Sequence, residues 1–397
     1  MRKITREDLS DEQEDILLGA PLKDIVLIQG PPGTGKTVMA FQRADALVRK
    51  NEAVNVIMFN KVLRRYSSNA SEKKIETKTM NSWMWWWWKK MMNRTYPEIE
   101  KWHPDWKQMY DLLLNKQNDG DLDIEKLNWN HLIIDEAQDF SNKLFEFLNK
   151  VRTTFFLNDA PPALTILADE NQMLTDENST LEQIKSSLQI ADEEKVFKLT
   201  ENWRNTDEII DLFNYFYTGT ETGISKKSGR HGSIPKLVFS GAFPKTIKYI
   251  CRYAKKYENQ EIGVIVSNNQ ELKMYYDALE EELIDSIFNV QTYSWQSKIH
   301  KAEYLNFDKE GTVTVLNRAS CKGLEFDAVF IPEIASMKII DGDLDQFKMN
   351  MYVMSSRARG NLFYIVDDYR SPVMSHFPSK EEKSQNTGLN LLEYEDA

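Results

Sequence analysis

The sequence predicts an α/β protein of two domains, each built on a parallel β-sheet. Short β-branched or apolar runs alternate with longer amphipathic stretches, which is the pattern of β-α-β units. The chain has 397 residues, more than one hydrophobic core usually organises, so two domains are expected. A Gly-rich segment from Thr218 to Gly232 separates two series of such runs.

Each series predicts the strands of one sheet. The first comprises Ile25–Gln29, Val54–Asn60, His131–Asp135 and Leu164–Asp169. The second comprises Lys236–Phe239, Gly263–Ser267, Thr312–Leu316, Ala328–Pro332 and Phe363–Asp367. We therefore expect an N-terminal domain over residues 1–205, with a short insertion at about 81–130, and a C-terminal domain over 206–368. Residues 369–397 are polar with little periodicity, which predicts a weakly ordered tail.

The composition excludes several classes of protein. Apolar residues make up 41% and charged residues 28% of the chain, as in ordinary globular proteins, and no apolar run approaches the roughly 20 residues of a membrane span. The N-terminus lacks the pattern of a secretory signal, so we expect a cytoplasmic protein without a membrane partner. Only Cys251 and Cys321 occur, which argues against a disulfide framework or structural zinc. The net charge of −11 argues against indiscriminate binding to polyphosphate.

A phosphate-binding loop (P-loop) is predicted at residues 30–37, which read GPPGTGKT. It follows an apolar run and precedes a helical stretch, the context that such a loop requires. Its backbone N–H groups would face phosphates, Lys36 would reach the β and γ phosphates, and Thr37 would supply a hydroxyl to Mg²⁺. The predicted cofactors are thus ATP and Mg²⁺, and the predicted contacts are Gly30, Gly33, Thr34, Gly35, Lys36 and Thr37.

Two carboxylates, Asp135 and Glu136, end the apolar run that begins at Leu132. In combination with a P-loop, Asp135 is predicted to hold Mg²⁺ through its water shell. Glu136 is predicted to orient and deprotonate the attacking water. The chain is therefore predicted to be an ATP hydrolase.

Further segments resemble, in the same order along the chain, the motifs of UvrD/Rep-like superfamily 1 helicases. They are Leu9–Gln13, Met58–Lys61, Asp135–Asp139, Ala168–Gln172, Thr200–Thr206, Lys322–Asp327 and Tyr352–Arg359. The resemblance spans about residues 9–365. It implies two RecA-like domains with the ATP site in the cleft between them, in a minimal two-domain motor.

The resemblance also implies a role for individual residues. Gln13 and Trp203 would contact adenine, and Glu325 would contact the nucleotide. Gln172 would sense the γ-phosphate, while Arg204 and Arg357 would compensate its charge during hydrolysis. The implied catalytic residues are Lys36, Glu136, Gln172, Arg204 and Arg357. As isolated residues, the two arginines would be ordinary surface side chains and Trp203 a core residue.

The predicted nucleic-acid contacts depart more from the family pattern. They are Phe59, Asn60, Lys61, Thr79, Asn81 and Trp83. Asn81 stands where the family carries histidine, and Met173–Asp176 replaces an aromatic and Trp-Arg-Gly stretch. Asn317 and Ala319 replace Thr and His, and Val38 replaces an arginine. The ATP contacts are thus largely kept, whereas several strand contacts are altered.

A run of tryptophans, Trp83 and Trp85 to Trp88, is followed by Lys89 and Lys90. Aromatic rings and lysines form platforms for single-stranded nucleic acid. Consecutive side chains of a helix point in all directions, so at most two of these rings would face one strand. A buried helix or a protein-docking surface is the alternative.

The leading functional prediction is an ATPase that is stimulated by nucleic acid and translocates on single strands. DNA is favoured over RNA, and 3′→5′ polarity is suggested by the resemblance alone. The alternative is an ATP-switched regulatory subunit that controls a protein partner, such as a nuclease, with little or no unwinding. The altered strand contacts and the acidic charge favour the alternative, whereas Glu136 and both arginines favour turnover.

Overall fold

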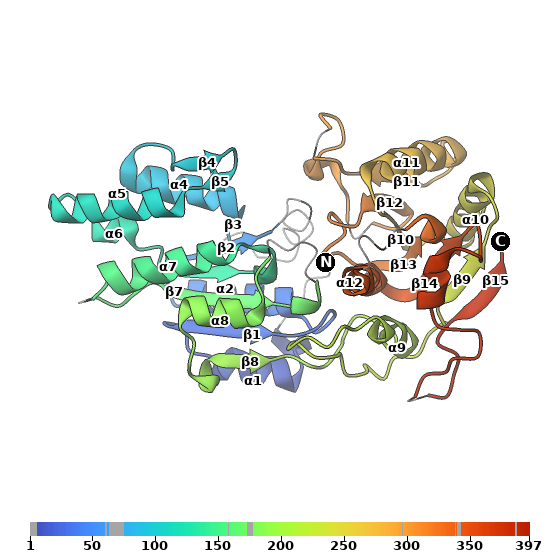
Figure 1. The fold of residues 1–397 in the computed structure, drawn as a ribbon, viewed down its shortest axis with the longest axis horizontal. Coiled ribbons are helices and arrows are strands. Elements are labelled where there is room, and N and C mark those ends of the chain that lie inside the picture. Colours follow the sequence, from blue (N-terminus) through green and yellow to red (C-terminus); the bar gives the residue numbers. More distant parts are fainter. Residues whose placement is uncertain are drawn as a thin grey trace. The chain divides into compact units, whose positions relative to one another are not determined.

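The chain divides into two compact α/β units in the computed structural model (Figure 1). The N-terminal unit contains described residues within Lys3–Gly30 and Gly35–Leu199, and the C-terminal unit contains Pro31–Thr34 and Thr200–Ala397. The described residues are 6–59, 62, 75–157, 159–172, 178–295, 297–307, 309–337, 339, 343–385 and 387–397. The division falls six residues before the boundary at 205 that the sequence predicts, and it assigns part of the P-loop to the C-terminal unit.

The N-terminal unit is built on a six-stranded parallel sheet with the order β3-β2-β6-β7-β1-β8. Its strands are β1 Ile25–Gln29, β2 Val54–Met58, β3 Thr77–Thr79, β6 His131–Ile134, β7 Ala163–Ala168 and β8 Val196–Lys198. Every residue of β1, β6 and β7 is buried, as expected of central parallel strands covered on both faces. The four strands predicted from the sequence are all present, within one or two residues of the expected bounds.

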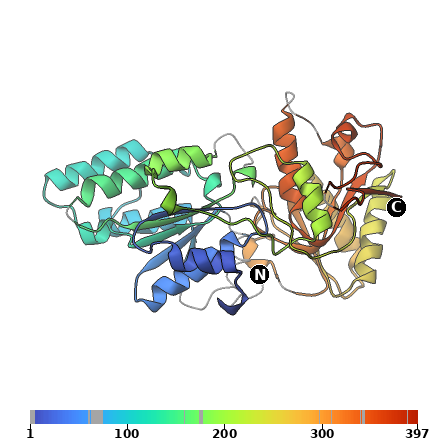
Figure 2. The same ribbon diagram turned by 90° about the horizontal axis from the view of Figure 1, so that it is seen from below.

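Helices and short 3₁₀ turns connect the strands of this unit. The helices are α1 Asp11–Gly19, α2 Lys36–Arg49, α4 Met80–Met92, α5 Trp106–Asn118, α6 Ile124–Leu127, α7 Asn142–Phe155 and α8 Leu181–Leu188. The 3₁₀ turns are Arg6–Asp8, Ala137–Asp139, Glu170–Gln172 and Glu193–Lys195. Helix α7 packs against both α5 and α8 (Figures 1 and 2). Helix α1 begins at a capping box in which Ser10 and Gln13 each bond the other's backbone N–H, an arrangement that stabilises a helix start.

The insertion between β3 and β6 contains α4, α5, α6 and the hairpin of β4 Glu98–Glu100 and β5 His103–Pro104. Trp83 and Trp87 stack inside it, with ring centroids 5.4 Å apart and planes inclined by 5°. Trp129 meets both rings edge-on, and Trp88 is also buried. Because residues four apart share one helix face, these rings form a single core. Trp83 is enclosed by protein and offers no ring face to a base, so its prediction as a nucleic-acid contact is wrong.

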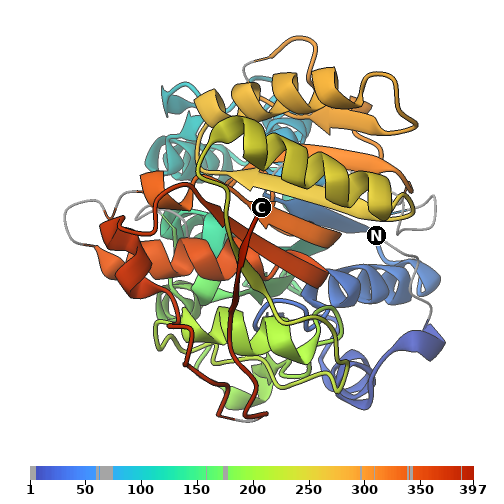
Figure 3. The same ribbon diagram turned by 90° about the vertical axis from the view of Figure 1, so that its right-hand side faces the viewer.

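The C-terminal unit is built on a seven-stranded parallel sheet with the order β11-β12-β10-β13-β14-β9-β15. Its strands are β9 Lys236–Phe239, β10 Glu261–Val266, β11 Asn289–Thr292, β12 Thr312–Asn317, β13 Phe326–Ile331, β14 Ala358–Val366 and β15 Glu393–Asp396. Helices α10 Phe243–Lys256 and α11 Asn269–Leu283 cover one face, and α9 Asp207–Tyr215 and α12 Leu344–Ser355 cover the other (Figure 3). Shorter 3₁₀ turns lie at Ala302–Tyr304, Ile334–Ser336 and Pro372–His376. The predicted fold class, α/β with two parallel sheets, is confirmed.

The segment 369–397 differs from the weakly ordered tail that its composition predicts. It ends in β15, which pairs in parallel with β9 at the edge of the sheet. The ammonium of Lys236 lies 2.7 Å from a carboxylate oxygen of Glu395, and Leu392 and Phe377 are buried. An edge strand held by backbone pairing and one ion pair needs few apolar residues, so apolar periodicity does not reveal it.

No described helix, in either unit, has the length and apolar character needed to cross a membrane.

Candidate functional site

The P-loop connects β1 to α2. Gly35 occupies the N-cap of α2 with φ +88°, a left-handed conformation that favours glycine. A Cβ atom at Gly35 would also overlap the side-chain amide of the buried Gln13. Gly35 makes no side-chain cap to this 14-residue helix, and the first N–H groups of a helix are the ones that can bind a phosphate.

Lys36, the first residue of α2, directs its ammonium back toward the loop. It donates to the carbonyl of Gly30 at 2.5 Å and lies 3.5 Å from Oδ2 of Asp169. Gln172 donates from Nε2 to the same oxygen at 2.5 Å, and all three side chains are buried. The structure thus brings together Lys36 and Gln172, two predicted catalytic residues that are far apart in the sequence.

Thr37 and Asp135 also meet, as their predicted shared role requires. The Thr37 hydroxyl donates to Oδ2 of Asp135 at 2.8 Å. Burial, and then the charge of Glu136, raise the pKa of the Asp135 carboxyl above its usual range, so a cation there would stabilise its ionised form. A hydroxyl and one carboxylate suit Mg²⁺, which keeps several of its waters. Among the described residues there is no group of three or more His, Cys, Asp or Glu placed to hold a metal ion.

Glu136 is a non-glycine residue in the left-handed region, with φ +53°, a backbone state that is often found at functional sites. Gln138 donates from Nε2 to Oε2 of Glu136 at 2.7 Å. The Oε1 atom of Gln138 accepts the backbone N–H of Asp169 at 2.9 Å. Gln138 therefore joins the predicted base to the Lys36–Asp169–Gln172 group. The sequence alone does not indicate this role, although Gln138 carries the one amide side chain of the segment Asp135–Asp139 and can both donate and accept.

In the C-terminal unit, Asn202 holds the part of the P-loop that belongs to this unit. Its Nδ2 donates to the carbonyl of Pro32 at 3.0 Å, and the backbone N–H of Trp203 donates to the carbonyl of Gly33 at 2.9 Å. Gly33 has φ +79°, and a Cβ there would lie 2.5 Å from the Asn202 amide. Thr34 is buried and donates to the carbonyl of Pro31 at 2.8 Å. No sequence motif indicates this role of Asn202.

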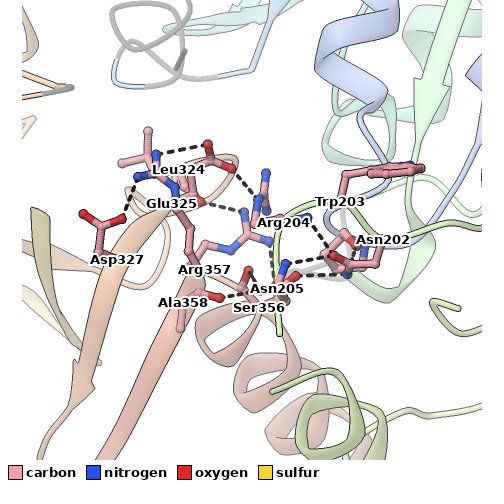
Figure 4. Close-up of polar contacts among 12 residues, drawn as sticks. Asn202, Trp203, Arg204, Asn205, Leu324, Glu325, Asp327, Ser356, Arg357 and Ala358 are labelled. Carbon is pink, nitrogen blue, oxygen red and sulfur yellow. Dashed lines mark hydrogen bonds and ion pairs between the residues drawn. The ribbon is translucent and has the colours of Figure 1, made fainter. Parts of the chain in front are cut away.

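Trp203 itself is 55% exposed. Its ring points away from the cluster of polar side chains that follows it (Figure 4). The alternative that Trp203 is a core residue is therefore wrong, and its contact with adenine stays a prediction.

Arg204 belongs to a network of charged side chains (Figure 4). It donates from Nε to Oε2 of Glu325 at 2.6 Å, while Arg359 donates to Oε1 of Glu325 at 3.1 Å. Arg359 also lies 3.1 Å from Asp327 and 3.3 Å from Glu261. Both carboxylate oxygens of Glu325 are thus engaged by arginines, and its nucleotide contact stays a prediction.

Arg357 is buried, with 1% of its surface exposed, so it is not an ordinary surface arginine. It donates to the carbonyl of Val353 at 2.9 Å, to the Ser356 hydroxyl at 2.8 Å and to the carbonyl of Leu324 at 3.4 Å. These bonds connect the end of α12 to the loop before β13.

Asn205 joins the segment of Arg204 to the segment of Arg357. Its Nδ2 donates to the carbonyls of Ala358 at 2.5 Å and Ser356 at 3.1 Å (Figure 4). Arg204 and Arg357 are therefore positioned by one hydrogen-bonded group within the C-terminal unit.

The predicted nucleic-acid contacts are less organised. Phe59 is 42% exposed and packs edge-on against Phe140. Thr79 ends β3 and precedes α4, and the Asn81 amide oxygen is buried without a hydrogen-bond partner among the described residues. Asn60 and Lys61 lie outside the described residues, as does Met173–Asp176.

The family model for the Schlafen group 3 DNA/RNA helicase domain matches residues 23–331. The chain belongs to this family. The residues that the family model matches include the P-loop, the Asp135–Glu136 pair and Glu325, and they end before Arg357. The family confirms a helicase-type chain, while the finer resemblance to UvrD/Rep-like proteins stays a prediction.

A solved structure, the C-terminal domain of a possible DNA helicase from Lactobacillus plantarum WCFS1, is similar to part of this chain. The two are 16% identical with a TM-score of 0.32, over 48% of this chain and 98% of that one. No curated protein matches the Schlafen-type chain.

Proposed function

We propose that this helicase domain hydrolyses ATP with Mg²⁺ and uses the energy to move along single-stranded nucleic acid. DNA is favoured over RNA, and 3′→5′ polarity is suggested only by the resemblance to UvrD-like proteins. The observation that carries the proposal is the buried group in which Lys36 and Gln172 meet Asp169 and in which Gln138 links Asp169 to Glu136. Such a group connects a phosphate-binding lysine to a candidate general base.

Different residues would bind the metal ion, bind the phosphates and accept the proton. Thr37 and Asp135 would hold Mg²⁺, which when bound neutralises charge on the phosphates. Lys36 and the first N–H groups of α2 bind the phosphates. Glu136 accepts a proton from the attacking water, and Gln138 orients the Glu136 carboxylate through their 2.7 Å hydrogen bond.

ATP turnover by the purified chain should rise when single-stranded DNA is added, because a motor that moves on a strand couples hydrolysis to binding it. Phosphate release would be measured with no nucleic acid, with single-stranded DNA and with single-stranded RNA of equal length. Turnover that is present but equal in all three reactions would contradict translocation.

Equal turnover in all three reactions would favour the alternative, an ATP-switched subunit that controls a protein partner. The net charge of −11 favours this alternative, because an acidic chain gains little non-specific attraction to phosphates. No turnover in any reaction would contradict the hydrolase itself.

Arg204→Ala and Arg357→Ala should each lower kcat by about 10²-fold or more, with a smaller change in ATP affinity, because their charges matter most as the γ-phosphate leaves. Of the two variants, Arg357→Ala should have the lower melting temperature. Arg357→Ala leaves the carbonyls of Val353 and Leu324 without this buried donor, whereas Glu325 keeps Arg359 when Arg204 is removed. Steady-state kinetics and thermal melting measure both effects.

Arg370 provides the matched control for the two arginines. It is exposed and pairs locally with Asp368, at 3.0 Å, so Arg370→Ala should keep the wild-type rate. A wild-type kcat in Arg204→Ala or Arg357→Ala would remove that arginine from the catalytic group.

A further inference from the structure

Helix α4 presents two of its tryptophans outward, on the side opposite its buried rings. Trp85 is 44% exposed and Trp86 is 40% exposed, whereas Trp83, Trp87 and Trp88 are buried. Lys89 and Lys90 lie four residues after the two exposed tryptophans, so each lysine shares a helix face with one ring. This helix therefore separates its aromatic residues into a core face and an outer face.

Three lysine ammonium groups lie over the two exposed rings. Lys89 Nζ is 4.5 Å from the ring centroid of Trp85. Lys78 Nζ is 4.3 Å and Lys90 Nζ is 5.7 Å from the centroid of Trp86. These distances are within the range of cation–π attraction. We name this surface the α4 outer face; it consists of Lys78, Trp85, Trp86, Lys89 and Lys90.

The three lysine side chains of the α4 outer face differ in how firmly neighbouring groups hold them. Lys78 belongs to β3 and is buried, and its ammonium is also held by Asn55 Oδ1 at 3.3 Å and Glu76 Oε2 at 3.0 Å, so it supports the Trp86 ring rather than facing a ligand. Lys89 and Lys90 are exposed side chains of the last turn of α4, on flexible four-carbon stems. They can therefore turn from the rings toward an incoming phosphate while Lys78 stays fixed.

The chemistry of this face suits single-stranded nucleic acid. Bases stack on exposed aromatic rings without regard to sequence, and adjacent lysines neutralise the phosphates between them. The chain as a whole carries a charge of −11, which repels a polyanion, whereas the positive charge of Lys89 and Lys90 beside two exposed rings is locally complementary to one. A purely apolar protein partner would have to desolvate these ammonium groups.

We propose that the α4 outer face binds single-stranded nucleic acid, with bases stacked on Trp85 and Trp86 and phosphates bound by Lys89 and Lys90. This inference deepens the proposed function and rests on it. The face directly follows Thr79 and Asn81, two predicted strand contacts at the start of α4.

The test measures the dissociation constants of fluorescently labelled oligothymidylate and oligouridylate by anisotropy. Trp85→Ala and Trp86→Ala should each weaken binding by roughly 5- to 150-fold, the range for loss of one stacked base. The double variant should weaken it further. Similar losses for both oligonucleotides would indicate that the ring faces, which DNA and RNA bases share, provide the contact.

Trp102 provides the matched control. It is 59% exposed, with the ammonium of Lys101 at 5.6 Å from its ring centroid, but it belongs to the turn between β4 and β5 rather than to the α4 outer face. Trp102→Ala should therefore bind both oligonucleotides as the wild type does. Trp87→Ala serves as a core control and should lower the melting temperature, which the outer-face variants should nearly keep.

Salt dependence tests the lysines separately. The double variant Lys89→Ala/Lys90→Ala should bind more weakly at low salt. The slope of its log affinity against log salt should be shallower by about 0.7 for each phosphate that the protein no longer neutralises. An unchanged slope would remove these lysines from the binding surface and overturn that part of the proposal.

The outcomes distinguish this inference from the proposed function. If single strands stimulate the wild-type ATPase but Trp85→Ala/Trp86→Ala binds them with wild-type affinity, the proposed binding role of the α4 outer face is wrong. The proposed motor activity is then retained. If the wild type neither binds nor responds to either oligonucleotide, both proposals fail. If the double variant keeps strand affinity but loses a co-purifying protein, the face is a protein-docking surface and the proposal is overturned.

Discussion

Replacing Glu136 by glutamine is expected to leave ATP binding nearly intact and to lower turnover by about 10²- to 10⁴-fold, the usual contribution of a general base. Glutamine has the same shape, and its amide oxygen can accept the hydrogen bond that Gln138 donates to Glu136. The charge of Glu136 raises the pKa of Asp135, so its removal favours the ionised Asp135 that Mg²⁺ requires.

Single-turnover kinetics and nucleotide binding by calorimetry would measure the two effects separately. Glu146→Gln is the matched control, because Glu146 is an exposed residue of α7 that bonds Asn142 at 3.0 Å. That variant should hydrolyse ATP at the wild-type rate. An equal loss of binding and turnover in Glu136→Gln would give Glu136 a structural role instead.

The central strands were predictable because their signal is local. Ile25–Gln29 has the bounds that the sequence predicts and is fully buried, since continuous apolar runs mark strands that are buried on both faces. Lys236–Phe239 also has the predicted bounds, although only its two middle residues are buried. The edge strands β3 and β8 have three residues each and were not predicted. A strand that short, with one exposed edge, leaves no run for periodicity to detect.

The tryptophan run shows what helical periodicity can and cannot decide. The spacing implies that at most two of Trp85 to Trp88 face one side, and the structure exposes Trp85 and Trp86. Periodicity alone does not say which pair faces outward, because that depends on where Trp129 and Phe147 pack against Trp87. Tertiary packing supplies this information.

The connections between motifs were the part of the site that the sequence could not reveal. Gln138, Asn202 and Asn205 each link segments that are distant along the chain, such as Asn205 to the carbonyl of Ala358. Asparagine and glutamine amides both donate and accept hydrogen bonds, which suits them to bridge a backbone carbonyl and an N–H. A composition or motif pattern does not distinguish such a residue from an exposed amide.

Lys36→Ala should reduce ATP hydrolysis by at least about 10²-fold and weaken ATP binding, because it removes the principal positive charge of the P-loop. It should also destabilise the N-terminal unit. The Asp169 carboxylate is fully buried and loses the ammonium at 3.5 Å; removing one partner of a buried ion pair commonly costs about 3–5 kcal/mol. Phosphate release, nucleotide binding and thermal melting would be compared with the wild type.

The double variant Lys36→Ala/Asp169→Asn separates the two effects. Neutralising Asp169 removes the buried negative charge that the Lys36 ammonium no longer compensates, so the double variant should melt at a higher temperature than Lys36→Ala. It should remain unable to hydrolyse ATP, because the charge that binds the phosphates is still absent. Recovery of turnover together with stability would mean that Lys36 acts only by supporting Asp169, and near wild-type turnover in Lys36→Ala would overturn the P-loop assignment.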